Sequence, residues 1–249
     1  MSKEPLVSII VPLYNYSMYV GYCIESIQNQ DYKNWELLVV DDCSTDNSYD
    51  IAKTFENDGR IKVMQTKENS GYSKAKNEGI VASKGGLLTF LDADDMFTTN
   101  SISIRVEALL KHDVPFVHAR AIRVKGAISL ENAYKIPYNT ISRNARIHAQ
   151  TILYQRWIHK KYGLYDETLR SKADKEMWFR LFGWGCLEPK IGKHFVKSNV
   201  AYYRKHGKSM MKKRSKNPKL QKKLTAKLKR AYKMRAIQID STNTRFLEE

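Results

Sequence analysis

The sequence predicts an α/β fold in which helices flank a single Rossmann-like, mostly parallel sheet. Short apolar runs rich in β-branched residues alternate with helical segments of roughly 10–15 residues, an order typical of βαβ units. Several of these runs end in acidic or amide side chains, and ligands of parallel sheets bind beside the carboxyl ends of the strands. A chain of 249 residues with 42% hydrophobic content can bury a substantial core.

The predicted elements alternate regularly through the first hundred residues and continue beyond them. Apolar runs predict strands at 6–13, 36–42, 60–65, 88–91 and 114–125. Helical periodicity predicts helices at 17–30, 47–57, 73–82 and 101–112. Ser17 is the expected N-cap of the first helix.

The run that begins at residue 88 ends in three carboxylates, Asp92, Asp94 and Asp95. Three like charges so close together repel one another unless a cation neutralises them. Mg²⁺ is commonly held by one or two carboxylates together with the phosphates of a substrate. The sequence therefore predicts a metal site that faces a nucleotide diphosphate, with a solvated acidic turn or a helix N-cap as the alternative.

Two further polar clusters follow predicted strands, Tyr14 with Asn15 and Asp41 with Asp42. In a parallel sheet these clusters and the acidic turn meet at one edge, which favours a binding site. The first strand is followed by neither a Gly-rich turn nor Gly-Lys-Ser/Thr, which excludes a dinucleotide fingerprint and a P-loop. A bound diphosphate would then depend on a metal ion for its neutralisation.

Four motifs occur in order between residues 5 and 100: Val-Pro-Leu-Tyr-Asn, Val-Val-Asp41-Asp42-Cys-Ser-Thr-Asp46, Asn69-Ser-Gly71 with Lys76-Asn77-Glu-Gly79, and Phe-Leu-Asp92-Ala-Asp94-Asp95. In this order and spacing the chain resembles the family 2 glycosyltransferases. The resemblance implies a GT-A fold, an inverting reaction and a nucleotide-diphosphate sugar as donor.

The resemblance also implies roles for individual residues. Asp41 would accept a hydrogen bond from the base, most simply uracil, and Asp92 would approach the ribose or the sugar. Asp94 would be the principal ligand of Mn²⁺ or Mg²⁺. Asp42 is either a turn residue or a direct contact, and Asp95 is expected to cap the following helix. The remaining implied donor contacts are Pro12, Tyr14, Asn15, Lys76 and Ala93.

A second constellation lies near residue 174. Met177, Trp178 and Leu181 have the spacing of a helix core, and Asp174 lies at the start of that helix. The resemblance implies that Asp174 is the catalytic base, although Ala173 stands where the family usually has Glu. Glu176 is the rival candidate, on a different face of the helix.

The segment Tyr202-Tyr203-Arg204-Lys205-His206 resembles a Tyr-Arg-x-His segment of the family. His206 would then complete the metal site or contact the diphosphate. The alternative is a basic loop with an incidental histidine.

The basic charge is concentrated near the C-terminus. Residues 212–235 hold twelve Lys or Arg and no acid, and they account for most of the formal net charge of +17. Leu220, Leu224 and Leu228 would form a narrow apolar stripe on a basic helix. This helix either packs on the catalytic domain, or contacts an anionic membrane surface, or binds nucleic acid. Nucleic acid is the least favoured, because no base-reading motif accompanies the charge.

The sequence predicts one GT-A domain at 1–211, with a nucleotide-binding half (1–100) and an acceptor-binding half (101–211), followed by a basic helical extension at 212–249. Three scattered cysteines and the absence of an apolar run near 18 residues favour a cytoplasmic protein, peripheral to the inner membrane face if the extension contacts lipid.

The predicted function is metal-dependent inverting transfer of a sugar, with a UDP-sugar favoured, to a hydroxyl of a glycan or lipid-linked acceptor in surface polysaccharide or glycoconjugate synthesis. Two alternatives stay open at this point. One is a nucleotidyltransferase on the same sheet, and the other is a membrane- or nucleic-acid-binding protein with an inactive transferase domain.

Overall fold

The computed structural model describes residues 4–125, 131–132, 147–169, 173–182, 191–206 and 226. The strands are β1 (Val7–Leu13), β2 (Trp35–Asp41), β3 (Ile61–Gln65), β4 (Leu87–Phe90), β5 (Met96–Phe97), β6 (Phe116–Lys125), β7 (Ile152–Gln155) and β8 (His194–Lys205). The helices are α1 (Val20–Gln28), α2 (Ser48–Lys53), α3 (Tyr72–Ala82), α4 (Ser101–Lys111), α6 (Trp157–Tyr162) and α7 (Ala173–Phe182), with a 3₁₀ turn η1 (Ala149–Thr151). Apart from residue 226, the predicted extension 212–249 lies outside the described residues.

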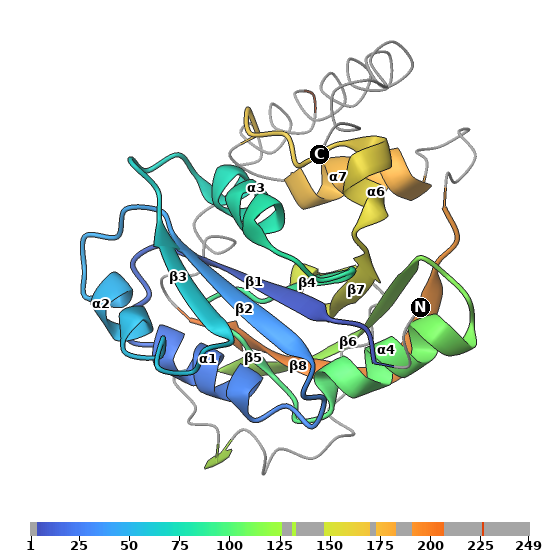
Figure 1. The fold of residues 1–249 in the computed structure, drawn as a ribbon, viewed down its shortest axis with the longest axis horizontal. Helices are drawn as coiled ribbons and strands as arrows, with labels where there is room; N and C mark the ends of the chain where they lie inside the picture. The colour runs from blue at the N-terminus through green and yellow to red at the C-terminus, as the bar shows by residue number, and fades with distance from the viewer. Residues whose placement is uncertain are drawn as a thin grey trace.

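One eight-stranded sheet runs through the molecule in the order β3-β2-β1-β4-β7-β6-β8-β5 (Figure 1). The first four strands in this order pair in parallel, as do β6 and β8. Strand β7 is antiparallel to both of its neighbours, and β5 is antiparallel to β8. The predicted α/β architecture is confirmed, and both predicted halves contribute strands to the same sheet.

Two hydrophobic cores lie on opposite faces of the sheet. In β1 the side chains alternate, so that Val7, Ile9 and Val11 belong to one core and Ile10 to the other. Helices α1, α2 and α4 lie on the first face, and α3, α6 and α7 lie on the second (Figure 1).

Helix α3 comes unusually close to the sheet, because it carries Gly79 at the point of contact. A Cβ atom at this position would lie 2.5 Å from Ile10 Cγ2 and 3.3 Å from Val40 Cγ2. Glycine is therefore required for the close approach of backbone and sheet. The contact packs α3 directly against β1 and β2.

Two predicted helix caps were wrong. Helix α1 begins at Val20 with Tyr19 as its N-cap, and no side chain caps it, whereas the amide of Ser17 donates to Asp46. Asp95 does not cap a helix, because β5 intervenes and α4 starts only at Ser101. The segment around residue 204, for which a basic loop was an alternative, belongs to β8.

Candidate active site

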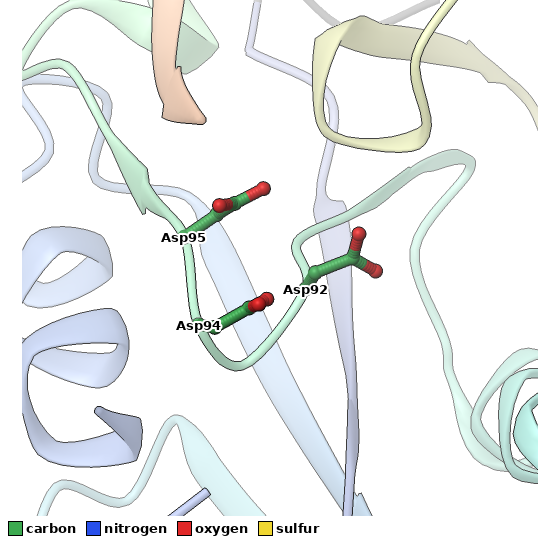
Figure 2. Close-up of side chains that lie close together, drawn as sticks. All are labelled: Asp92, Asp94 and Asp95. Carbon is green, nitrogen blue, oxygen red and sulfur yellow. The ribbon is translucent and has the colours of Figure 1, made fainter. Parts of the chain in front are cut away.

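The acidic turn that follows β4 brings its three carboxylates together. Asp92, Asp94 and Asp95 each offer an oxygen, and these oxygens lie within 4.8 Å of one another (Figure 2). The turn is closed by a 2.8 Å hydrogen bond from the amide of Asp95 to the carbonyl of Asp92. The three acids are nevertheless not equivalent, because each has a different partner.

Asp95 is a structural group. One oxygen accepts the backbone amide of Arg204 at 2.7 Å, and the other accepts Nε2 of Gln150 at 2.9 Å. Burial, followed by the charges of Asp94 and Asp92, raises the pKa of Asp95 well above its ordinary value. Its role is to hold β8 against the turn, and β8 leads directly into His206.

Asp94 is paired with the predicted second metal ligand. Nε2 of His206 lies 2.8 Å from Oδ2 of Asp94, and the His206 ring packs on Tyr19 with ring centroids 4.8 Å apart. In octahedral coordination with bonds of about 2.1 Å, adjacent ligand atoms lie about 3 Å apart. The 2.8 Å contact is a hydrogen bond between the two side chains, and it is also close to the spacing of adjacent ligands of one divalent ion. The carboxylate oxygen suits Mg²⁺ or Mn²⁺, and the imidazole nitrogen suits Mn²⁺ better than Mg²⁺.

Asp92 faces a different partner, the hydroxyl of Tyr72. The Tyr72 hydroxyl donates to Oδ1 of Asp92 at 2.6 Å. Burial, followed by the charge of Asp94, raises the pKa of Asp92 to about 6. Tyr72 was not among the predicted site residues, because nothing in its turn sequence indicates that its hydroxyl reaches the acidic turn.

The carboxyl ends of β1 and β2 lie side by side, since Leu13 pairs with Asp41 in the parallel register. Asn15 adopts a left-handed conformation (φ 56°), and its side-chain oxygen accepts the amide of Thr45 at 2.8 Å. The side chain of Tyr14 is 43% exposed. The predicted convergence of these two clusters is therefore present.

The other predicted donor contacts at this edge are buried. Asp41 is fully buried and accepts hydrogen bonds from the amide of Ser44 at 3.0 Å and from Nε2 of Gln65 at 2.9 Å. Pro12 lies buried within β1, and Ala93 is 1% exposed inside the acidic turn.

Asp42 holds a loop that is distant in the sequence, and the backbone amides that its carboxylate binds do not belong to its own turn. Its carboxylate accepts the amides of Ser70 and Gly71 at 2.8 and 2.7 Å. It thereby fixes the loop between β3 and α3.

The predicted base, Asp174, lies in the first turn of α7 and is joined to α3. Nζ of Lys76 lies 2.6 Å from Oδ1 of Asp174, although the two residues are 98 positions apart in the sequence. The side chain of Lys76 is completely buried, whereas that of Asp174 is 32% exposed. Lys76 was predicted to contact the donor, but in the structure its ammonium group binds the predicted base.

Glu176, the rival base, is fully buried and forms a salt bridge with Arg180, with Oε1 and Nε 2.7 Å apart. Arg180 also donates to the carbonyl oxygens of Tyr162 and Leu164, so the pair anchors the Gly163 turn to α7. Asp174, at 32% exposed, is therefore the more exposed of the two acids in the first turn of α7.

A family model described as glycosyl transferase family 2 matches residues 8–167, more than half of the chain. The chain belongs to glycosyl transferase family 2. The predicted family and enzyme class are thereby confirmed, and membership in a glycosyltransferase family decides against the nucleotidyltransferase alternative.

Relatives of this family 2 chain agree with the assignment. It is 27% identical over 208 residues to the Escherichia coli protein WfgD, named UDP-Glc:alpha-D-GlcNAc-diphosphoundecaprenol beta-1,3-glucosyltransferase, covering 78% of this chain and 80% of WfgD. S. aureus TarS 1-349 in complex with UDP-GlcNAc matches with a TM-score of 0.66 and 22% identity, over 83% of this chain and 60% of that chain. The mannosyltransferase PcManGT from Pyrobaculum calidifontis, solved with GDP-Man and Mn²⁺, matches with a TM-score of 0.58 and 20% identity, over 78% of this chain and 57% of that chain.

The solved structures confirm the GT-A fold of this family 2 enzyme, and the chain spans about three-fifths of the TarS chain. In the part of the chain that the structure describes, no helix has the length and apolarity needed to cross a membrane.

Proposed function

We propose that the enzyme transfers a sugar from a UDP-sugar to a hydroxyl of a glycan or lipid-linked acceptor, with inversion and with the help of a divalent metal ion. The observation that carries the proposal is a chain of contacts between two acids. Asp174 pairs with Lys76, whose ammonium lies 4.9 Å from the ring centre of Tyr72, and the hydroxyl of Tyr72 binds Asp92. The exposed acid of α7 and the acidic turn therefore belong to one site.

The nucleotide would bind at the carboxyl ends of β1 and β2. The exposed ring of Tyr14 is suited to stacking on a base, and aromatic faces are general platforms for bases. Asp41 is fully buried, so a base N–H would reach it only after a local rearrangement. UDP as the nucleotide is supported by the UDP and UDP-GlcNAc complexes of TarS and by the UDP-Glc donor in the name of WfgD.

Asp94 and His206 would hold the metal ion, with Asp92 beside them. A bound Mn²⁺ or Mg²⁺ would stabilise the negative charge of the departing diphosphate as a Lewis acid. The Mn²⁺ in the PcManGT complex supports a metal ion in a related fold. Asp95 would not serve as a ligand, since both of its oxygens already accept hydrogen bonds.

Asp174 would act as the general base. Its carboxylate would take the proton of an acceptor hydroxyl, whose oxygen attacks the anomeric carbon from the face opposite the diphosphate. The new glycosidic C–O bond forms while the C–O bond to the diphosphate breaks, so the configuration is inverted. A positioned base of this kind typically contributes about 10²–10⁴-fold to the rate.

The acceptor class is supported by WfgD, whose printed name gives a sugar linked to diphosphoundecaprenol. We propose a lipid-linked glycan intermediate of surface polysaccharide or glycoconjugate synthesis. Peripheral membrane contact through the basic extension 212–249, with the catalytic domain at 1–211, stays part of this proposal. The protein would then act at the cytoplasmic face of the inner membrane.

The test is a product assay with UDP-glucose, UDP-GlcNAc, UDP-galactose and GDP-mannose, each with GlcNAc-diphosphoundecaprenol as acceptor and with either Mn²⁺ or EDTA. We expect one UDP-sugar to give a glycosylated lipid in Mn²⁺ and little product in EDTA. Turnover with GDP-mannose alone would overturn the choice of UDP. Equal turnover in EDTA and Mn²⁺ would overturn the metal dependence.

A further inference from the structure

The side chain of Lys76 ends in a closed aromatic environment. Its Nζ lies 4.0 Å from the ring centre of Phe90, 4.2 Å from that of Tyr165 and 4.9 Å from that of Tyr72. Among the described residues, Asp174 is the one carboxylate within hydrogen-bond distance of this ammonium group. We propose that Lys76 is a positioning residue that holds Asp174 for catalysis, an inference that rests on the proposed function of Asp174 as the base.

Burial of Lys76 strengthens its preference for Asp174 as a partner. An ammonium group removed from water is very unfavourable unless a charge and hydrogen bonds compensate for the lost hydration. The three rings contribute cation–π attraction, which is stronger where the cation is desolvated. They surround Nζ with apolar surface, so that its strongest available partner in the described structure is Asp174.

The position of Lys76 is fixed by its own helix. One face of α3 carries Ser73, Lys76 and Asn77, which have the i, i+3, i+4 spacing of neighbours on a helix. Ser73 Oγ donates to the carbonyl of Leu169 at 3.1 Å, and Asn77 Nδ2 donates to the carbonyl of Tyr165 at 2.9 Å.

The amide of Tyr165 donates back to Asn77 Oδ1 at 3.0 Å, which completes a reciprocal pair. These bonds tie the segment that leads toward α7 to the same helix face that carries Lys76. The Gly79 contact with the sheet holds that face in place. The position of the ammonium group is therefore fixed by α3, and the ion pair with Lys76 orients Asp174.

The geometry leaves one oxygen of the base available. Lys76 binds Oδ1, and among the described residues no second partner binds Asp174. The side chain of Asp174 is 32% exposed. Oδ2 is therefore the oxygen that receives the proton of the acceptor hydroxyl, while Oδ1 stays bound to Lys76.

A direct role of Lys76 in donor binding fits the structure less well. The side chain is 0% exposed, so a diphosphate could reach Nζ only after the aromatic rings had moved. The link to the donor side is indirect and runs through Tyr72, which binds Asp92. Lys76 should thus affect the rate of transfer and leave the affinity for the nucleotide unchanged.

The experiment compares Lys76→Met with the wild-type enzyme, with Lys74→Met as the matched control on a more exposed position of α3. Met keeps the length of the side chain and removes its charge. We expect kcat to fall roughly 10²-fold, as is typical when a catalytic group is misplaced by about 1 Å. The Kd for UDP with Mn²⁺, measured by calorimetry, and the thermal midpoint should stay close to the wild-type values. In Lys74→Met the kcat, the Kd for UDP and the thermal midpoint should all stay close to those of the wild-type enzyme.

A second variant gives an independent readout. Lys76→Ala should lose activity in the same way and should regain part of it when propylammonium is added, because the cation can enter the vacated aromatic space. Lys74→Ala should not respond to propylammonium. Rescue of kcat without a change in the Kd for UDP supports the positioning role.

Several outcomes would overturn the proposal. A weaker Kd for UDP with unchanged kcat in Lys76→Met would make Lys76 a donor ligand, as the sequence analysis expected. Unchanged kcat and Kd, no rescue by propylammonium, or loss of the folded state in both variants would leave Lys76 a structural residue at most. Failure of the proposed function would be recognised separately. Either the wild-type enzyme would transfer no sugar from any donor, or Asp174→Asn would transfer sugar at the wild-type rate. In both cases the proposed role of Lys76 would be wrong as well.

Discussion

The acidic turn after β4 and the acid of α7 are built in opposite ways. The turn crowds three carboxylates within reach of one another, and a tyrosine hydroxyl, an imidazole and a backbone amide give each of them a different partner. On α7 one partly exposed carboxylate, Asp174, is held by one buried ammonium group. The first region contains an excess of negative charge, whereas the second carries its own counter-charge.

With the roles proposed for the two regions, this difference would separate donor binding from the transfer step. Burial and the repulsion between crowded carboxylates raise the pKa of Asp92 and of Asp95, and a bound cation relieves the same repulsion. The cluster is therefore suited to recruit a metal ion and a diphosphate. A carboxylate with a built-in cation needs no recruited ion and can keep one oxygen for a proton. Removal of the metal should therefore disable donor binding, and changes near Asp174 should slow transfer while donor binding persists.

The largest effect is expected for Asp174→Asn. The amide keeps the size of the side chain but cannot accept the acceptor proton as a base, so kcat should fall about 10³-fold, within the usual range for a general base. The Kd for UDP in the presence of Mn²⁺ should stay within a factor of two of the wild-type value. Glu176→Gln is the comparison on the same helix and should lower the thermal midpoint, because it breaks a buried ion pair. Loss of UDP affinity in Asp174→Asn would show that the two regions are not separate.

The next effect is expected for Asp94→Ala, which removes the carboxylate paired with His206. We expect the affinity for UDP in Mn²⁺ to fall roughly 10²-fold, since a metal ion can contribute several kcal/mol to the stabilisation of phosphoryl charge. Calorimetry with Mn²⁺ and with EDTA measures the effect, and the variant should no longer distinguish the two conditions. Asp50→Ala, at an exposed position of α2, is the control. An unchanged metal dependence in Asp94→Ala would place the metal elsewhere.

The two regions also differ in how far the sequence predicts them. The acidic turn is local, because its three acids follow one apolar run, and the parallel order of β1, β2 and β4 places the other strand ends beside it. The contact between Lys76 and Asp174 joins positions 98 apart, and neither periodicity nor composition indicates it. The same holds for Gln150, which reaches Asp95 from a segment without a clear pattern.

The wrong cap at Asp95 has a related cause. The sequence does not disclose the two-residue strand β5 that separates this acid from α4, because two residues are too few to show a period. It also does not disclose that β8 would supply a backbone amide to the same carboxylate. Local patterns therefore predicted which acids gather, and tertiary contacts decided which of them are available.

A smaller effect is expected for Gly79→Ala. The added Cβ would lie 2.5 Å from a methyl group of Ile10, so α3 must move away from the sheet. Overpacking of this kind typically destabilises a protein by about 1–3 kcal/mol, measured by urea unfolding. Gly86→Ala is the control, because its Cβ would meet no atom within 4 Å. Since α3 carries Lys76, kcat should fall in Gly79→Ala while the Kd for UDP is preserved.

The smallest effect is expected for Tyr72→Phe, which tests the link between the two regions. The change removes the hydroxyl that binds Asp92 and keeps the ring that faces Lys76. The loss of one hydrogen bond contributes about 1 kcal/mol, so the KM for the UDP-sugar should rise roughly fivefold. The value of kcat should change less than twofold, because Lys76 keeps its aromatic neighbour and its bond to Asp174. A fall in kcat as large as that of Lys76→Met would mean that Tyr72 transmits the state of the donor site to the base, and the two regions would then act as one catalytic unit.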